Sequence, residues 1–166
     1  VRSIINAAGI KKTNIETSVL VTSKVLEFEI GTSKLDIIND LLAAINYEPL
    51  HFDNKGYAVS RRYIEPLNRR TEQAYMTNDR SIIKSGAKQS VDIYNVPNIF
   101  VRYTDDPDGA EFRSEYINDN PGSVISTVSR GRNVVDIESV DDIADQSTLN
   151  DLVRRVAIEK SQTYDA

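Results

Sequence analysis

Two separated segments of the sequence repeat apolar residues at the spacing of an α-helix, and this periodicity constrains the fold more than any other feature. The first segment, 34–46, carries the stripe Leu35, Ile38, Leu42 and Ile45, widened by Ile37, Leu41 and Ala44. The second segment, 147–161, carries the stripe Leu149, Leu152, Val153, Val156 and Ala157. Because a helix buries such a stripe against another element, both segments are predicted to be amphipathic core helices.

Polar residues mark both ends of the first predicted helix. Ser33 followed by Asp36 is typical of a capping box, in which a side-chain oxygen accepts a free backbone N–H of the first turn. Asn46 and Pro49 indicate where the helix ends.

The second predicted helix has two possible caps, Asp145 and Ser147, and the sequence does not choose between them. A third, shorter helix is predicted near 1–8, where Val1, Ile4, Ile5 and Ala8 share a face. Gly9 supplies the left-handed residue that commonly ends a helix.

Outside the helices the apolar period changes to two, which is typical of half-buried strands. Strands are predicted at 26–30, on both sides of an Asp53–Gly56 turn, at 91–93 and 99–103, at 110–116 and at 132–138. Gly56 suits the positive φ of a hairpin turn, so a hairpin directly after the first core helix is predicted.

Clustered strands, rather than strands in strict alternation with helices, favour an α+β fold. We predict a mostly antiparallel sheet with two or three amphipathic helices packed on it. The 166 residues are predicted to form a single α+β domain over 1–166, with a weak division near 66–90 where the pattern is least regular.

Composition excludes several classes of protein. The net charge of −5 comes from 25 acidic and 20 basic residues spread along the chain, so no basic cluster suits a nucleic-acid backbone. No apolar run is long enough to span a membrane. The absence of cysteine removes disulfides, thiolate metal sites and cysteine nucleophiles.

The candidate catalytic residues each have a simpler structural interpretation. His51 is the single histidine, and no nucleophile motif surrounds any serine. Glu111 and Glu115 lie near aromatic residues, but regular alternation places them on the wet side of a strand, and the chain has no tryptophan to bind a sugar. Asp141 and Asp142 are interpreted as solvent-exposed residues of the segment that precedes the last helix.

The acidic run Asp105-Asp106-Pro107-Asp108-Gly109 is the one candidate metal loop. Pro107 interrupts the run, and the glutamate six residues after Gly109 is Glu115, on a predicted strand where a calcium loop cannot wrap. Turn formation explains the run better. The glycines stand singly, so no phosphate loop exists. The sequence therefore predicts no catalytic, cofactor-binding or metal-ligating residue.

Three stretches of the sequence resemble tail proteins of phages and prophages of Gram-positive bacteria. They are GTSKLDII at 31–38 with LLAAINY at 41–47, Phe52, Asp53 and Gly56; VDIYNVPN at 91–98; and NPGS at 120–123, RGR at 130–132 and DDIADQ at 141–146. The pattern is similar to the baseplate hub, or late-control-protein-D-like, proteins of contractile tails. The resemblance covers most of the chain from Gly31 onward and rests on an overall pattern, not on one short motif.

The resemblance implies a structural protein of the virion tail, made in the host bacterial cytoplasm, with no catalytic residues. Such hubs form a trimeric ring between the tail tube and the spike, so the expected partners are the tube, the spike and neighbouring hub subunits. This chain would be an α+β middle domain of a longer protein, whose ring-forming barrels lie elsewhere. The full-length protein is then expected to be a homotrimer and this segment a monomer.

Two alternatives stay open at the level of sequence. One is a tail-associated cell-wall hydrolase, since some tails carry such enzymes. The other is a module that binds wall carbohydrate, for which eight scattered tyrosines offer some stacking surface.

Overall fold

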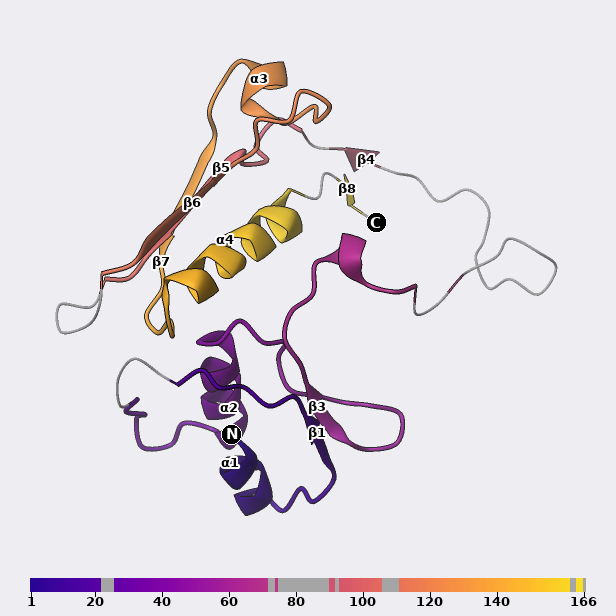
Figure 1. Ribbon diagram of the computed structural model, residues 1–166, viewed down its shortest axis with the longest axis vertical. Helices are drawn as coiled ribbons and strands as arrows, with labels where there is room; N and C mark the ends of the chain where they lie inside the picture. The colour runs from indigo at the N-terminus through magenta and orange to yellow at the C-terminus, as the bar shows by residue number, and fades with distance from the viewer. Residues whose placement is uncertain are drawn as a thin grey trace.

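Two lobes, each built around its own small core, make up the computed structural model of the chain (Figure 1). The structure describes residues 1–21, 26–71, 74, 90–91, 93–105, 111–161 and 164–165. The first lobe takes residues up to about the short 3₁₀ helix η1 (Pro66–Asn68), and the second lobe begins near residue 93.

The first lobe packs two helices against a small sheet. Its elements are α1 (Arg2–Ala7), β1 (Thr13–Ile15), α2 (Lys34–Ala43), β2 (His51–Phe52) and β3 (Ala58–Ser60). The strand order is β1-β3-β2, with β1 parallel to β3 and β2 antiparallel to it. Ile5, Ile38, Leu42 and Tyr47 form the buried core of this lobe.

Local signals set the boundaries of α2 as the sequence predicts. The Ser33 hydroxyl accepts the backbone N–H of Asp36 at 3.1 Å, which caps the helix, and donates to the Asp36 carboxylate at 2.7 Å. The regular helix ends at Ala43, and a turn over residues 44–46 carries the chain to Asn46, whose φ of 53° is left-handed. The short helix α1 and the left-handed Gly9 after it, with φ 84°, also agree with the prediction.

The predicted hairpin is confirmed. β2 and β3 flank a turn in which the Asp53 carboxylate accepts backbone N–H groups of Lys55 at 2.9 Å and Tyr57 at 2.8 Å. Gly56 has φ 76°, a conformation that side chains other than glycine seldom adopt.

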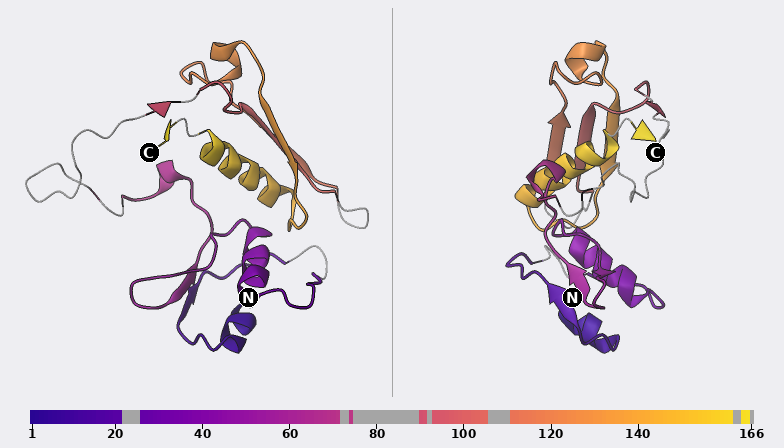
Figure 2. Two further views of the ribbon diagram at one scale, coloured as in Figure 1. Left: turned by 180° about the vertical axis from the view of Figure 1, so that it is seen from behind. Right: turned by 90° about the vertical axis from the view of Figure 1, so that its right-hand side faces the viewer.

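The second lobe is a three-stranded sheet with one long helix across it. Its strands are β5 (Ile99–Tyr103), β6 (Arg113–Ile117) and β7 (Val135–Ser139), in the order β6-β5-β7. The central β5 is antiparallel to β6 and parallel to β7. The helix α4 (Gln146–Lys160) packs on one face, and α3 (Thr127–Arg130) lies beyond one end of the strands (Figures 1 and 2).

Phe100 from β5 and Val153 and Ala157 from α4 form the core of the second lobe. This confirms that the apolar stripe predicted at 147–161 covers a sheet. Asp145 is the N-cap: its carboxylate accepts the backbone N–H of Thr148 at 2.7 Å. Short strands β4 (Ser90–Val91) and β8 (Tyr164–Asp165) pair antiparallel near the chain's end.

The α+β fold class is therefore confirmed. Of the strand pairings described above, those of β2–β3, β4–β8 and β5–β6 are antiparallel, whereas β1–β3 and β5–β7 are parallel, so both three-stranded sheets are mixed. That residues 1–166 form a single domain remains a prediction. The two lobes have separate cores.

One predicted strand is wrong. Residues 26–29 are irregular, and Ile30 stands in a turn with its side chain fully exposed. Alternation of Leu26, Phe28 and Ile30 with glutamates suits a strand, but no described strand lies beside this segment to accept its backbone hydrogen bonds. The predicted division near 66–90 lies mostly outside the described residues.

The cap of α4 gives a first prediction. Replacing Asp145 with alanine leaves the N–H of Thr148 without its carboxylate and lowers the free energy of unfolding by about 1 kcal/mol. Urea denaturation measures the loss. Ser147→Ala is the matched control, because Ser147 is exposed and its hydroxyl does not cap the helix. An equal loss in both variants would contradict the assignment of the cap.

Candidate functional site

The two lobes meet where the polar side of α4 faces the loop after β3. The Arg62 guanidinium binds the Asp151 carboxylate at 2.8 Å, and that of Arg154 binds Glu65 at 3.2 Å. Both pairs bridge the lobes. All four side chains are partly open to solvent, so each pair contributes little stability.

Arg155 makes a more enclosed side-chain contact across the junction than these two ion pairs, since its side chain is 19% exposed. Its guanidinium carbon stands 4.7 Å from the centre of the Tyr63 ring, and one of its nitrogens lies 3.4 Å from both the Asn46 side-chain oxygen and the Tyr47 carbonyl. Burial, followed by the nearby Glu159 carboxylate, raises the pKa of Tyr63. Tyr63 therefore stays a neutral phenol that can receive a cation on its face.

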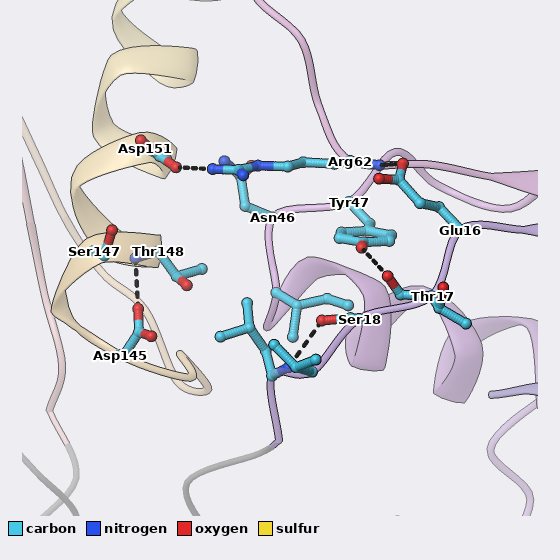
Figure 3. Close-up of a pocket in the computed structure, with 13 residues that line it drawn as sticks. Glu16, Thr17, Ser18, Asn46, Tyr47, Arg62, Asp145, Ser147, Thr148 and Asp151 are labelled. Carbon is cyan, nitrogen blue, oxygen red and sulfur yellow. Dashed lines mark hydrogen bonds and ion pairs between the residues drawn. The ribbon is translucent and has the colours of Figure 1, made fainter.

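A cavity of about 390 Å³ with a mixed polar and apolar lining opens beside the Arg62–Asp151 bridge (Figure 3). Its walls come from the loop after β1, the end of α2 and the first turns of α4. The labelled lining residues are Glu16, Thr17, Ser18, Asn46, Tyr47, Arg62, Asp145, Ser147, Thr148 and Asp151. It is the clearest candidate for a ligand or active site in the described part of the chain.

The carboxylates of this cavity are already engaged in structural contacts. Glu16 accepts the backbone N–H of Arg62 at 3.1 Å, and Asp151 holds the guanidinium of Arg62. Asp145 caps α4, and the N–H of Thr148 lowers the pKa of its carboxyl. A general acid needs a raised pKa, so Asp145 is poorly suited to that role. Each carboxylate of this cavity therefore already serves a contact that holds the structure together.

A second charged cluster lies on the α4 side of the sheet. The buried Arg102 guanidinium binds Asp136 at 2.6 Å and Glu138 at 3.1 Å, and Lys160 binds Asp136 at 2.6 Å. Burial alone would raise the pKa of Asp136, but hydrogen bonds from Lys160 and Arg102 outweigh it and lower the pKa. The cluster is internally balanced, with two acids and two bases.

The structure does not bring the candidate catalytic residues together. His51 is exposed, and its Nδ1 lies 3.2 Å from the Pro49 carbonyl. Glu115 lies on β6 and is exposed, as the strand interpretation predicts. Glu111 is exposed too, but it precedes the strand, which begins at Arg113. Asp141 is exposed, and Asp142 is half-buried beside it.

The acidic loop is described only at Asp105, because residues 106–110 lie outside the described part. Among the residues that are described, no three histidine or acidic side chains are grouped so as to hold a metal ion. The absence of a metal site remains a prediction for the loop itself.

The structure shows one surface that sequence reasoning missed, the face of the second-lobe sheet opposite α4. Phe100 points at α4, so alternation along β5 turns Ile99, Val101 and Tyr103 to the other face. The strand registers place Ile117, Val135 and Ile137 on that same face. Val135 and Ile137 lie on the strand predicted at 132–138, but periodicity cannot tell which face of a sheet is covered.

Comparison of the chain with protein-family models, with curated proteins and with solved structures gave no match. Among the helices that are described, none is both long and apolar enough to cross a membrane.

The junction gives a second prediction. Arg155→Ala removes the contact with the Tyr63 ring and the hydrogen bonds to Asn46 and Tyr47 of the first lobe. It is expected to lower the free energy of unfolding by about 1–2 kcal/mol. Arg154→Ala, one residue away on the same helix, costs less than about 0.5 kcal/mol because its ion pair is exposed. Urea denaturation of the two variants tests the difference. Equal losses would show that Arg155 does not hold the lobes together.

The charged cluster gives a third prediction, on pH. Because the folded state lowers the pKa of Asp136, this carboxylate adds stability above the unfolded pKa of about 3.9, and the gain is lost as pH falls through the folded pKa. Asp136→Asn therefore lowers the unfolding free energy by about 2 kcal/mol near neutral pH. The difference in unfolding free energy between the variant and the natural chain disappears in acid. A difference that stays constant with pH would contradict the ion pairing.

Proposed function

We propose that this chain is a non-catalytic structural domain of a phage or prophage tail, at the baseplate hub or tail tip, and that it acts by protein–protein contact. The observation that carries the proposal is the open apolar face of the sheet β6-β5-β7. The resemblance to hub proteins supplies the biological setting, and the open face supplies a surface suited to it.

The open face exposes large apolar side chains that a self-contained domain would cover. Ile117, Val135 and Ile137 are 48%, 53% and 64% exposed to solvent. Figure 1 shows the sheet nearly edge-on, with α4 on one side and no described helix or strand on the other. An antiparallel sheet commonly buries one face and exposes polar residues to solvent on the other. Apolar residues on the exposed face therefore favour a site of contact with another protein.

Charged residues border this apolar surface. Glu115 and Arg113 come from β6 on the same face, opposite Val101 and Tyr103 of the central strand. Val101 at the centre of this face is itself buried, and the exposed apolar residues flank it on β6 and β7. Apolar surface with charged residues beside it is common in protein contact surfaces. The charges favour a definite orientation of the partner.

In the tail, the partners of this surface would be the proteins that meet at the hub: the tube, the spike and neighbouring hub subunits. The full-length protein would form the homotrimeric ring, and the assembled protein would reside in the virion tail after synthesis in the host cytoplasm. The engaged carboxylates of the junction cavity support a structural role over a hydrolytic one.

A fourth prediction tests the role in tails. In the full-length protein, Ile117→Lys places a charge in the open face and lowers incorporation into purified tail particles about tenfold, the effect of losing one apolar contact of the interface. Quantitative mass spectrometry of the particles measures incorporation. Val19→Lys is the matched control, since Val19 is fully exposed on the other lobe. Normal incorporation of the Ile117 variant would contradict the role of this face.

Absence of the natural chain from purified tails would refute the tail assignment itself. The hydrolase alternative is tested by loss of turbidity in a Gram-positive cell-wall suspension. Activity that Glu111→Gln or Asp108→Asn abolishes would overturn the non-catalytic proposal.

A further inference from the structure

One edge of the second-lobe sheet, that of β7, has no strand beside it in the described part of the chain. The Val134 carbonyl accepts N–H groups of Asn98 and Ile99, and the Val140 N–H donates to the Tyr103 carbonyl. Even-numbered residues of this segment therefore bond toward β5. By the alternation of a strand, the N–H and C=O groups of the odd-numbered residues point outward; these are Val135, Ile137 and Ser139.

The other edge of the same sheet is partly closed. The Arg113 carbonyl of β6 points outward and accepts the Gln146 side-chain amide at 3.0 Å. The helix α4 packs over β5 and β6, so it lies toward that closed edge. In the described part of the chain, no such side-chain hydrogen bond closes the edge of β7, and α4 lies away from it.

β7 also lacks the usual protection of an edge strand. Edge strands commonly carry proline, a bulge or an outward lysine that discourages further pairing. β7 reads Val-Asp-Ile-Glu-Ser, and its two charges, Asp136 and Glu138, are held by Arg102 and Lys160 on the α4 face. Val135 and Ile137 present apolar side chains to the open face, beside outward backbone groups that no described strand pairs with.

We propose that β7 pairs antiparallel with β7 of a second copy of this chain, in a register centred on Ile137. The two sheets then join into one of six strands. Ile137 lies opposite Ile137 of the second copy, and Val135 lies opposite Ser139, so every outward N–H of one strand meets an outward C=O of the other.

Charge favours a second copy as the occupant. The register sets Asp136 opposite Glu138 of the other copy, which would repel if these acids were free. In each copy, however, Arg102 and Lys160 neutralise them, so the pairing brings together four acids and four bases. The apolar strip of Val135 and Ile137 continues across the two-fold axis.

This inference goes beyond the proposed function, because it holds whether or not the chain belongs to a tail. It also replaces the monomeric state that the hub resemblance implies for this segment. The two are separable by experiment: the tail proposal concerns the face, probed at Ile117, and the present inference concerns the β7 edge.

Cysteine trapping tests the register directly, since the natural chain has no cysteine. Directly opposed residues of a hydrogen-bonded pair stand about 5.5 Å apart at Cα, which a disulfide can span. Ile137→Cys is therefore expected to give a disulfide-linked dimer under mild oxidation. Val128→Cys, equally exposed on α3, is expected to stay monomeric on a denaturing gel. Equal cross-linking of both variants would overturn the register.

Sedimentation equilibrium tests the edge without a cross-link. The natural chain is expected to show a concentration-dependent rise from the mass of one chain to that of two. Ile137→Pro removes an outward N–H while sparing the ladder to β5, so it is expected to abolish the dimer. Ile117→Pro, the corresponding change on the β6 edge, is expected to keep it. A natural chain that stays monomeric, or that forms trimers, would overturn the inference.

Discussion

The rest of the structure depends on the packing of α4, because this helix uses both of its sides. Its apolar stripe covers Phe100 on the sheet, and its polar side carries the arginines that meet the first lobe. The cap at Asp145 fixes where the helix begins and so sets which residues fall on each side. One helix therefore supplies a core to the second lobe and joins it to the first through polar contacts.

This arrangement also decides what stays uncovered. A single helix is too narrow to cover a three-stranded sheet completely, and α4 lies over β5 and β6. The far face and the β7 edge are what remains, and both carry β-branched apolar residues. The exposed surface thus follows from having one helix for one sheet, and the contact proposals concern the parts that this helix does not reach.

Local patterns allowed much of the fold to be predicted, and non-local pairing accounts for what could not be. The capped helix after Ser33, the hairpin at Gly56 and the stripe of α4 depend on neighbours within a few residues, and all three are confirmed. The alternation at 26–30 is as regular as that of β7, yet only β7 found a strand to pair with. Alternation reports a tendency to pair, whereas a strand also requires a partner that sequence spacing does not specify.

For the candidate site, too, the sequence shows which residue types are present but not what they contact. Sequence alone singled out His51 and runs of acids, because residue type is what a sequence displays. The structure commits several other charged groups to holding parts together: Asp145 to a helix end, Asp136 to Arg102, and Arg155 to an aromatic ring. The carboxyl pKa values of Asp136 and Asp145 are lowered, which moves both groups further from the raised pKa that a proton donor near neutral pH needs. Together with the exposed apolar residues of the sheet, this use of charge supports our proposal that the chain acts by contact with another protein surface.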